Sequence, residues 1–219
     1  MWWPTVPVNL ALLFGLLLTP WGYAARGQIQ GPGPVQEAVV VHVADGDTVT
    51  LNTGQRVRLL GIDAPEMEKE GHPADFLAHK AKKVLADLVQ GKRVRLEYDK
   101  LRYDRYGRTL AYLFLLDGTN LSQEMVRQGL AHVYTIPPNL RFREELLAAQ
   151  REAIAAHRGV WLEALKQDEP FYIGNRRSLL FHRPSCHLGQ NTAKSNRVLF
   201  KSPTEAYLQG YSPCRTCKP

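Results

Sequence analysis

The sequence predicts an α+β protein in which a medium-sized domain is followed by a small one. Two observations predict the first domain: short β-branched or alternating runs that suit strands, and longer segments whose apolar residues recur at helical spacing. A third observation predicts the second domain, because all three cysteines lie within residues 171–219. With 44% hydrophobic residues the chain can bury a core, which excludes a disordered protein.

Each element follows from a local pattern. Strands are predicted at residues 37–44, 49–51, 56–60, 93–98 and 109–116. Helices are predicted at residues 74–90, 120–129 and 140–157. The second and third strands are joined by a tight turn at residues 52–55, so we expect a hairpin there.

Acidic residues flank this hairpin. Asp47 precedes its first strand and Asp63 follows its second, so the hairpin can bring the two carboxylates together, with Glu66 close behind. Such oxygen donors suit a hard cation such as Ca²⁺. Arg58 lies in the same hairpin and carries a planar charge suited to phosphate. Together these residues indicate phosphate chemistry.

The motifs around this hairpin resemble the staphylococcal nuclease (thermonuclease) family. DGDTV, RLLGIDAPE, DRYGR, LAY and MVRQGLAHVY occur in the family's order within residues 37–162. The resemblance implies a five-stranded OB-type β-barrel with three helices. It also implies Ca²⁺-dependent cleavage of DNA and RNA that leaves 3′-phosphate ends.

The resemblance assigns roles to individual residues. The implied roles are Ca²⁺ binding by Asp47, Asp63 and the backbone carbonyl of Ala64, general base catalysis by Glu66, and phosphate binding by Arg58 and Arg108. The implied nucleotide contacts are Arg105, Tyr106 and Tyr134, although a solvated hairpin tip is the alternative for the loop that holds the first two. Asp45 matches a further carboxylate near the ion, with an Asx turn before Gly46 as the alternative.

The cysteines predict a zinc site. His182 and Cys186 are four positions apart, and 27 residues separate Cys186 from the pair Cys214 and Cys217. Two close pairs of such ligands are typical of tetrahedral structural zinc. A Cys214–Cys217 disulfide and His187 as a rival ligand are the alternatives. The segment resembles the metal-binding domain of Ada-type DNA-repair proteins, in which a methyl-accepting cysteine stands at the position of His182. We therefore expect the zinc fold without the repair activity.

The amino terminus predicts export. Residues 1–24 contain no Asp, Glu, Lys or Arg, and residues 8–19 are almost wholly apolar. This pattern favours a secretory signal that is cut after Ala24, with an uncleaved membrane anchor as the alternative. Either leaves the body of the protein outside the cytoplasm. Residues 25–36 are interpreted as a linker.

The combined prediction is a secreted, Ca²⁺-dependent nuclease with a structural Zn²⁺. A net charge of +7 favours polyanionic partners, and we expect DNA and RNA as partners, a monomer, and no small-molecule cofactor. A non-catalytic nucleic-acid-binding module and a surface-attached or DNA-uptake nuclease are the alternatives. No catalytic match lies beyond Trp161, so we expect residues 37–165 and 170–219 to be separate domains, and residues 25–165 to keep turnover on short substrates.

Overall fold

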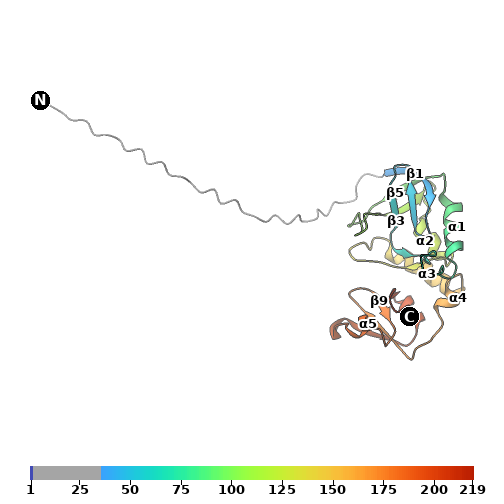
Figure 1. Cartoon of the computed structure of the whole chain (residues 1–219), viewed down its shortest axis with the longest axis vertical. Helices are drawn as coiled ribbons and strands as arrows, with labels where there is room; N and C mark the ends of the chain where they lie inside the picture. The colour runs from blue at the N-terminus through green and yellow to red at the C-terminus, as the bar shows by residue number, and fades with distance from the viewer. Residues whose placement is uncertain (2–35) are drawn as a thin grey trace.

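The computed structural model describes Met1 and residues 36–219. The predicted signal or anchor at residues 1–24 lies outside the described residues, apart from Met1, and so does the linker apart from Gln36, which begins the first strand. Within the described part of the chain, no helix is long and apolar enough to cross a membrane. The rest of the chain forms a β-barrel with helices packed on it and a smaller C-terminal unit (Figure 1).

Five strands close the barrel in the order β1-β2-β3-β6-β5. They are β1 (Gln36–Val43), β2 (Thr48–Leu51), β3 (Arg56–Leu59), β5 (Arg93–Glu97) and β6 (Thr109–Leu115). The β3–β6 pair is parallel and the other pairs are antiparallel. The strands bury alternate residues in the barrel core, among them Val40, Val49, Val57, Leu59, Val94 and Leu96. This confirms the predicted barrel.

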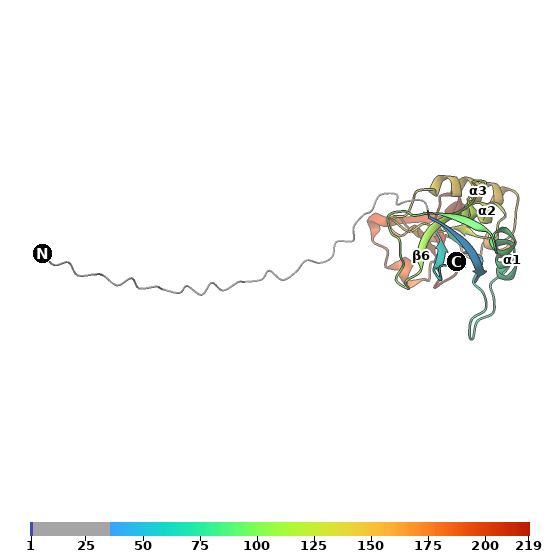
Figure 2. The same ribbon diagram turned by 90° about the horizontal axis from the view of Figure 1, so that it is seen from above.

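Helices gather on one side of the barrel (Figure 2). They are α1 (Ala78–Val89), α2 (Leu121–Arg127), α3 (Arg143–Ala155) and the short α4 (Trp161–Ala164). The side chain of Asn120 caps α2 by accepting a hydrogen bond from the Gln123 amide. Helix α1 begins four residues later than the sequence predicts, because Leu77 has a left-handed backbone conformation with φ of 66°.

A two-stranded ladder outside the barrel leads toward the C-terminal unit. It pairs β4 (Ile62–Asp63) with β7 (His132–Val133), and Asp63 lies opposite His132. The ladder therefore fixes the position of Asp63 directly after the β2–β3 hairpin.

The C-terminal unit is built on a four-stranded sheet in the order β10-β8-β9-β11. Its elements are β8 (Tyr172–Asn175), β9 (Leu180–His182), α5 (His187–Gln190), the 3₁₀ helix η1 (Lys194–Asn196), β10 (Arg197–Phe200), α6 (Pro203–Leu208) and β11 (Ser212–Pro213). The Ser202 side chain caps α6 by accepting a hydrogen bond from the Glu205 amide. Gly210, with φ of 78°, follows the end of this helix.

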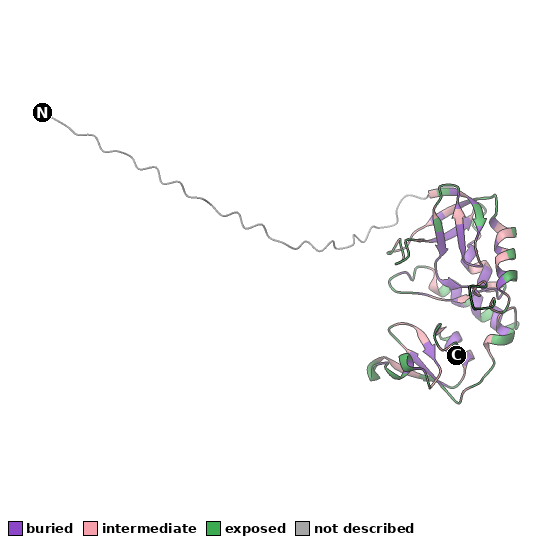
Figure 3. Ribbon diagram, viewed as in Figure 1, coloured by how far each residue is buried: buried purple, intermediate pink, exposed green. Residues whose placement is uncertain are grey.

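A second hydrophobic cluster joins the two units, and Figure 3 shows buried residues in both. Trp161 of α4 is fully buried, and its ring meets Tyr207 of α6 edge to face at 4.9 Å between centroids. Gln150 of α3 donates from Nε2 to the Tyr207 carbonyl at 2.8 Å. Ser212 donates from Oγ to the Val133 carbonyl at 2.7 Å. The barrel unit and the C-terminal unit therefore share one core.

Candidate active site

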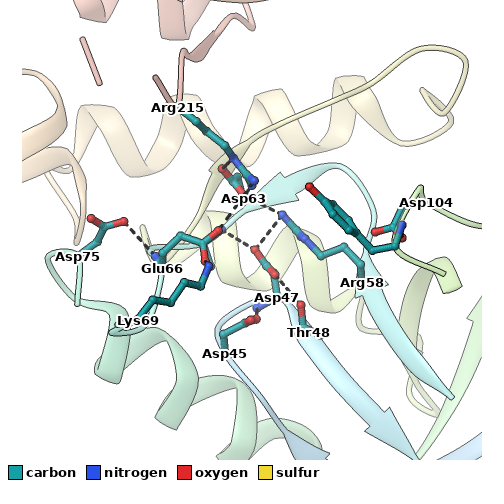
Figure 4. Close-up of polar contacts among 12 residues, drawn as sticks. Asp45, Asp47, Thr48, Arg58, Asp63, Glu66, Lys69, Asp75, Asp104 and Arg215 are labelled. Atoms are coloured by element: carbon teal, nitrogen blue, oxygen red, sulfur yellow. Dashed lines mark hydrogen bonds and ion pairs between the residues drawn. The ribbon is translucent and has the colours of Figure 1, made fainter. Parts of the chain in front are cut away.

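Three buried charged residues meet at one end of the barrel (Figure 4). Arg58 Nη2 lies 2.9 Å from Asp47 Oδ2 and 2.7 Å from Asp63 Oδ1. Arg58 Nη1 donates to the Leu59 carbonyl at 3.0 Å, which fixes the plane of the guanidinium. The structure thus brings together both aspartates and the first arginine that the sequence indicates.

The β2–β3 hairpin positions Asp47. Thr48 lies opposite Arg58 in the ladder, and the Asp47 carbonyl accepts from the Leu59 amide at 2.8 Å. The Asp47 carboxylate accepts from the Thr48 hydroxyl at 3.0 Å and from the Ala64 amide at 2.8 Å. The Ala64 amide therefore lies beside Asp47, and the role of the Ala64 carbonyl stays a prediction.

Gly46 allows this close packing. A Cβ atom at position 46 would lie 2.7 Å from the Cβ of Ala64 and 2.8 Å from the Cβ of Ala81 in α1. Any larger residue would push the turn away from α1. Asp45 accepts from the Asp47 amide at 3.0 Å through Oδ1, which is the Asx-turn contact considered as its alternative role.

The carboxylates differ in their electrostatic environment. Burial raises the pKa of Asp47 to about 7; Arg58 lowers it, whereas Asp45 and Asp63 raise it further. Burial would also raise the pKa of Asp63, but His132, Arg58 and Arg215 together outweigh it and hold that pKa below its usual value. Burial lowers the pKa of His132 against the opposing effect of Asp63. Burial therefore disfavours the ionised form of both carboxylates, and neighbouring cations outweigh this effect at Asp63 but not at Asp47.

Glu66 lies beside the aspartate pair and is open to solvent. Its side chain is 44% exposed, and its Oε2 lies 2.6 Å from Lys69 Nζ. Its amide donates to Asp75 Oδ2 at 3.1 Å, and its Oε1 lies 3.9 Å from Arg215 Nη1. The carboxylate is thus accessible to water at the edge of the buried cluster.

Arg108 lies just before β6, the strand parallel to β3. Thr109 faces Val57 in that parallel ladder, so Arg108 lies beside Arg56 at the start of β3. Its Nε pairs with Asp104 Oδ2 at 2.7 Å within the same loop. The loop also holds Arg105 and Tyr106, both exposed at its tip, with the Arg105 guanidinium 4.8 Å from the Tyr106 ring centroid. These residues form a cationic, aromatic loop before β6.

A further arginine reaches the site from the C-terminal unit, and the sequence analysis did not place it there. Arg215 donates from Nε to Asp63 Oδ2 at 3.2 Å and from Nη2 to Asp63 Oδ1. Its guanidinium lies 5.4 Å from the ring centroid of Tyr134. In the sequence Arg215 lies between Cys214 and Cys217, which places it in the loop of two zinc ligands but does not indicate that it contacts Asp63.

A cleft of about 570 Å³ opens at this point between the two units. Its walls include Asp63 and Glu66 from the barrel unit and Arg215 and Lys218 from the C-terminal unit. The volume falls in the range of sites that hold a small ligand. A strand of nucleic acid could therefore present part of its backbone to Asp63 and Glu66 there.

The donors around Asp47 fit a hard divalent cation in their chemistry. Asp47 and Asp63 offer carboxylate oxygens, and the adjoining Ala64 backbone offers a carbonyl. Two buried carboxylates that converge within 3 Å of one guanidinium form a donor set of the kind that a hard cation prefers.

The C-terminal unit gathers the four zinc ligands that the sequence indicates. Ligand atoms of His182, Cys186, Cys214 and Cys217 all lie within 4.8 Å of one another. The Cys186 Sγ to His182 Nδ1 distance is 3.6 Å, and the three cysteines are free. The structure therefore supports zinc over a Cys214–Cys217 disulfide, and it leaves His187 exposed outside the group.

Comparisons with known proteins agree with both sites. A family model described as "Staphylococcal nuclease homologue" matches residues 56–163. The thermonuclease of Staphylococcus intermedius is 34% identical over 145 residues, which is 61% of this chain and 86% of that protein. The chain belongs to the staphylococcal nuclease family. The nuclease is also similar to the thermonuclease of Staphylococcus hyicus, at 34% identity over 126 residues, or 56% of this chain and 73% of that one.

Two further matches extend this result. Endonuclease YncB of Bacillus subtilis is 33% identical over 122 residues, covering 53% of this chain and 57% of its own length. A model described as "Metal binding domain of Ada" matches residues 163–219 of the nuclease. The family prediction and the zinc-binding C-terminal domain are thus confirmed, and the protein is a nuclease, a phosphodiesterase that acts on nucleic acid.

Proposed function

We propose that this nuclease is a secreted, Ca²⁺-dependent enzyme that hydrolyses DNA and RNA and leaves 3′-phosphate ends. The observation that best supports this proposal is the buried cluster in which Arg58 lies within 3 Å of both Asp47 and Asp63, the last of which lines a cleft. Carboxylates for a hard cation and an arginine for phosphate are what hydrolysis of a charged diester requires.

The cation would be held by Asp47, Asp63 and the Ala64 carbonyl. When bound, Ca²⁺ would supply positive charge that neutralises a phosphate oxygen. The Arg58 guanidinium pairs with both aspartates and so keeps the two carboxylates close together. Their positions are fixed by the hairpin and by the Ala64 amide, so little reorganisation is needed.

Glu66 is the proposed general base. Its exposed carboxylate can reach a water molecule in the cleft and accept a proton from it at an Oε atom. Lys69 Nζ lies 2.6 Å from the other oxygen, Oε2. The Asp75 carboxylate holds the Glu66 backbone through the amide contact.

Two arginines would bind the phosphate and stabilise the extra charge of the five-coordinate transition state. The structure assigns Nη1 and Nη2 of Arg58 to Leu59 and the aspartates, which leaves other N–H donors of the five on the guanidinium for phosphate. Arg108 is held by Asp104 and is 27% exposed in its side chain, so it can also reach a ligand. Charge-assisted bonds from a planar fork suit a phosphate that gains charge.

The location is proposed from residues 1–24 and their apolar segment. Mass spectrometry of the exported protein tests it. A mature chain that begins at Ala25 is expected, and one that still begins at Met1 would favour the anchored alternative.

Cleavage with and without Ca²⁺ tests the proposed activity. Purified residues 25–219 are incubated with labelled single-stranded DNA or RNA in Ca²⁺ or in EDTA, and products are treated with a 3′-phosphatase. We expect cleavage of both substrates in Ca²⁺ alone and a mobility shift after phosphatase. Asp63→Asn should abolish the Ca²⁺ response, whereas Asp87→Asn on the exposed face of α1 is the matched control. Full activity in EDTA would contradict the metal assignment.

A further inference from the structure

The zinc loop of the C-terminal domain touches the nuclease site at two points. Arg215 contacts Asp63 through Nε and Nη2, and its Nη1 lies 3.9 Å from Glu66 Oε1. Lys218 Nζ lies 3.1 Å from Asp75 Oδ1, and the other oxygen of that carboxylate holds the Glu66 amide. Figure 4 shows Arg215 reaching Asp63 from the C-terminal side, opposite Arg58.

The fold holds Arg215 firmly at its backbone. It lies between Cys214 and Cys217, two of the four zinc ligands, and the Cys214 amide donates to the Phe181 carbonyl at 2.9 Å. Two residues earlier, Ser212 donates to the Val133 carbonyl next to His132 in the β4–β7 ladder. The zinc loop, residues 214–217, is thus linked to β4, which bears Asp63, through Ser212 and β7.

Other arginines of the domain have internal structural contacts. Arg183 pairs with Glu169 and donates to the Cys217 and Lys218 carbonyls. Arg197 donates to the Gln190 and Thr192 carbonyls. These contacts hold the zinc domain itself together, whereas Arg215 is directed across the cleft at the site of the other domain.

The setting of Arg215 suits an anion that enters from the cleft. Its side chain is 55% exposed and lines the cleft, while one face of the guanidinium lies over Tyr134. A planar guanidinium of this kind binds phosphate through two parallel N–H donors. An adjacent ring can stack a base or support the cation. Phosphate backbone and base are the two parts that a nucleic-acid strand would present there.

We propose that the zinc-binding domain supplies a third arginine to the nuclease site, and that Arg215 binds a phosphate of the nucleic-acid strand in the cleft. The inference rests on the proposed Ca²⁺-dependent hydrolysis. Arg215 pairs with Asp63, and with substrate present the same guanidinium binds the phosphate. The zinc domain is therefore part of the active site, and zinc holds the loop that carries its arginine.

The proposal predicts opposite effects of one substitution on two measurements. Removing the charge of Arg215 takes a cation away from Asp63, so Ca²⁺ binding should become stronger. The same change removes a phosphate contact, so substrate should bind less well. If Arg215 only blocked the site, its removal would raise the affinity for both Ca²⁺ and substrate. If Arg215 made a purely structural contact, its removal would change neither affinity.

The experiment compares Arg215→Ala and Arg215→Lys with the wild-type chain, and uses Arg177→Ala as a control that removes the same charge from the exposed β8–β9 turn. Calorimetry measures Ca²⁺ affinity, and kinetics with a short single-stranded DNA in saturating Ca²⁺ give kcat and KM. For Arg215→Ala we expect Ca²⁺ affinity to rise about 3- to 10-fold and kcat/KM to fall about 10- to 100-fold, mainly through KM. Arg215→Lys should lie between, and Arg177→Ala should match wild type.

Each result decides the inference. A rise in both Ca²⁺ affinity and kcat/KM would show that Arg215 blocks the site, and unchanged values would show a contact between domains only; either overturns the proposal. Zinc content and thermal melting confirm that the variants are folded. If Arg215→Ala disturbs the loop, Arg215→Lys still tests whether the guanidinium at this position binds phosphate, because it keeps the charge and most of the side-chain length. If the wild type does not cleave, the proposed function fails. Anisotropy of a labelled short single-stranded DNA then tests Arg215 directly, since equal affinity of wild type and Arg215→Ala overturns the inference.

Discussion

Tyr207 is the side chain on which the joint between the two domains depends most. It is 3% exposed, and its ring meets those of Trp161 and Phe181 edge to face at 4.9 and 5.1 Å between centroids. It also approaches the ring of His132 at 6.1 Å, on the strand beside Asp63. Tyr207→Ala should therefore weaken the shared core and loosen the second domain from the site.

The size of the effect follows from burial. Truncating a buried aromatic side chain to alanine costs about 3–5 kcal/mol of unfolding free energy, because it removes apolar contacts and leaves a cavity. Two edge-to-face pairs of about 0.5–1.5 kcal/mol each are lost as well, which places the total for Tyr207→Ala near the upper end of that range. For a chain of this size, about 5 kcal/mol lowers Tm by about 10–20 °C.

Fluorescence of one tryptophan can follow this change. The tryptophans of the chain are Trp2, Trp3, Trp21 and Trp161, so residues 25–219 retain Trp161 as a single reporter at the joint. Thermal unfolding is measured for wild type, Tyr207→Ala and Tyr207→Phe, which keeps the ring and should lose about 1 kcal/mol or less. A loss under about 1.5 kcal/mol for alanine, or separate melting of the two domains in the wild type, would refute a shared core.

Other predictions concern the site itself. Arg108→Ala should lower kcat about 100-fold, because its contact with phosphate strengthens as charge builds, whereas Lys100→Ala in the same loop should have no effect; kinetics on short DNA decide between them. The pKa of Asp47, raised to about 7 by burial, means that the carboxyl is protonated below that pH and must release a proton to bind Ca²⁺. Calorimetry should therefore show Ca²⁺ affinity falling about tenfold per pH unit below about pH 7, and a constant affinity would exclude this coupling. Stripping Zn²⁺ and restoring only Ca²⁺ should lower cleavage even of short DNA, because Cys214 no longer fixes the Arg215 loop; unchanged rates would contradict that link.

Much of the barrel could be predicted because its signals are local. Alternation in the strands, the Asn120 cap and the tight turn at residues 52–55 each act over a few residues. The hairpin then brings Asp47, Arg58 and Asp63 together as a direct consequence of its geometry. Closely spaced zinc ligands are a local signal of the same kind, since tetrahedral zinc limits which residue types and spacings can form it.

The joint between the domains could not be predicted in this way. Arg215 and Asp63 are 152 residues apart, and nothing in the Cys214–Cys217 loop distinguishes an arginine that faces solvent from one that faces another domain. Trp161 marks the end of the barrel domain in the sequence, yet in the structure it is buried against Tyr207. The expectation that residues 25–165 act alone on short substrates stays a prediction, and that truncation would open the cluster that Trp161 and Tyr207 share.

The central claim is that Glu66 acts as general base beside the Asp47–Arg58–Asp63 cluster. The most direct measurement is the single-turnover cleavage rate of a short single-stranded DNA in saturating Ca²⁺, together with its affinity. Glu66→Gln is compared with Glu68→Gln, which changes an exposed carboxylate in the same loop. The account predicts that Glu66→Gln cuts about 100-fold or more slowly with nearly unchanged DNA affinity, whereas Glu68→Gln behaves as wild type. Cleavage by Glu66→Gln at close to the wild-type rate would contradict it.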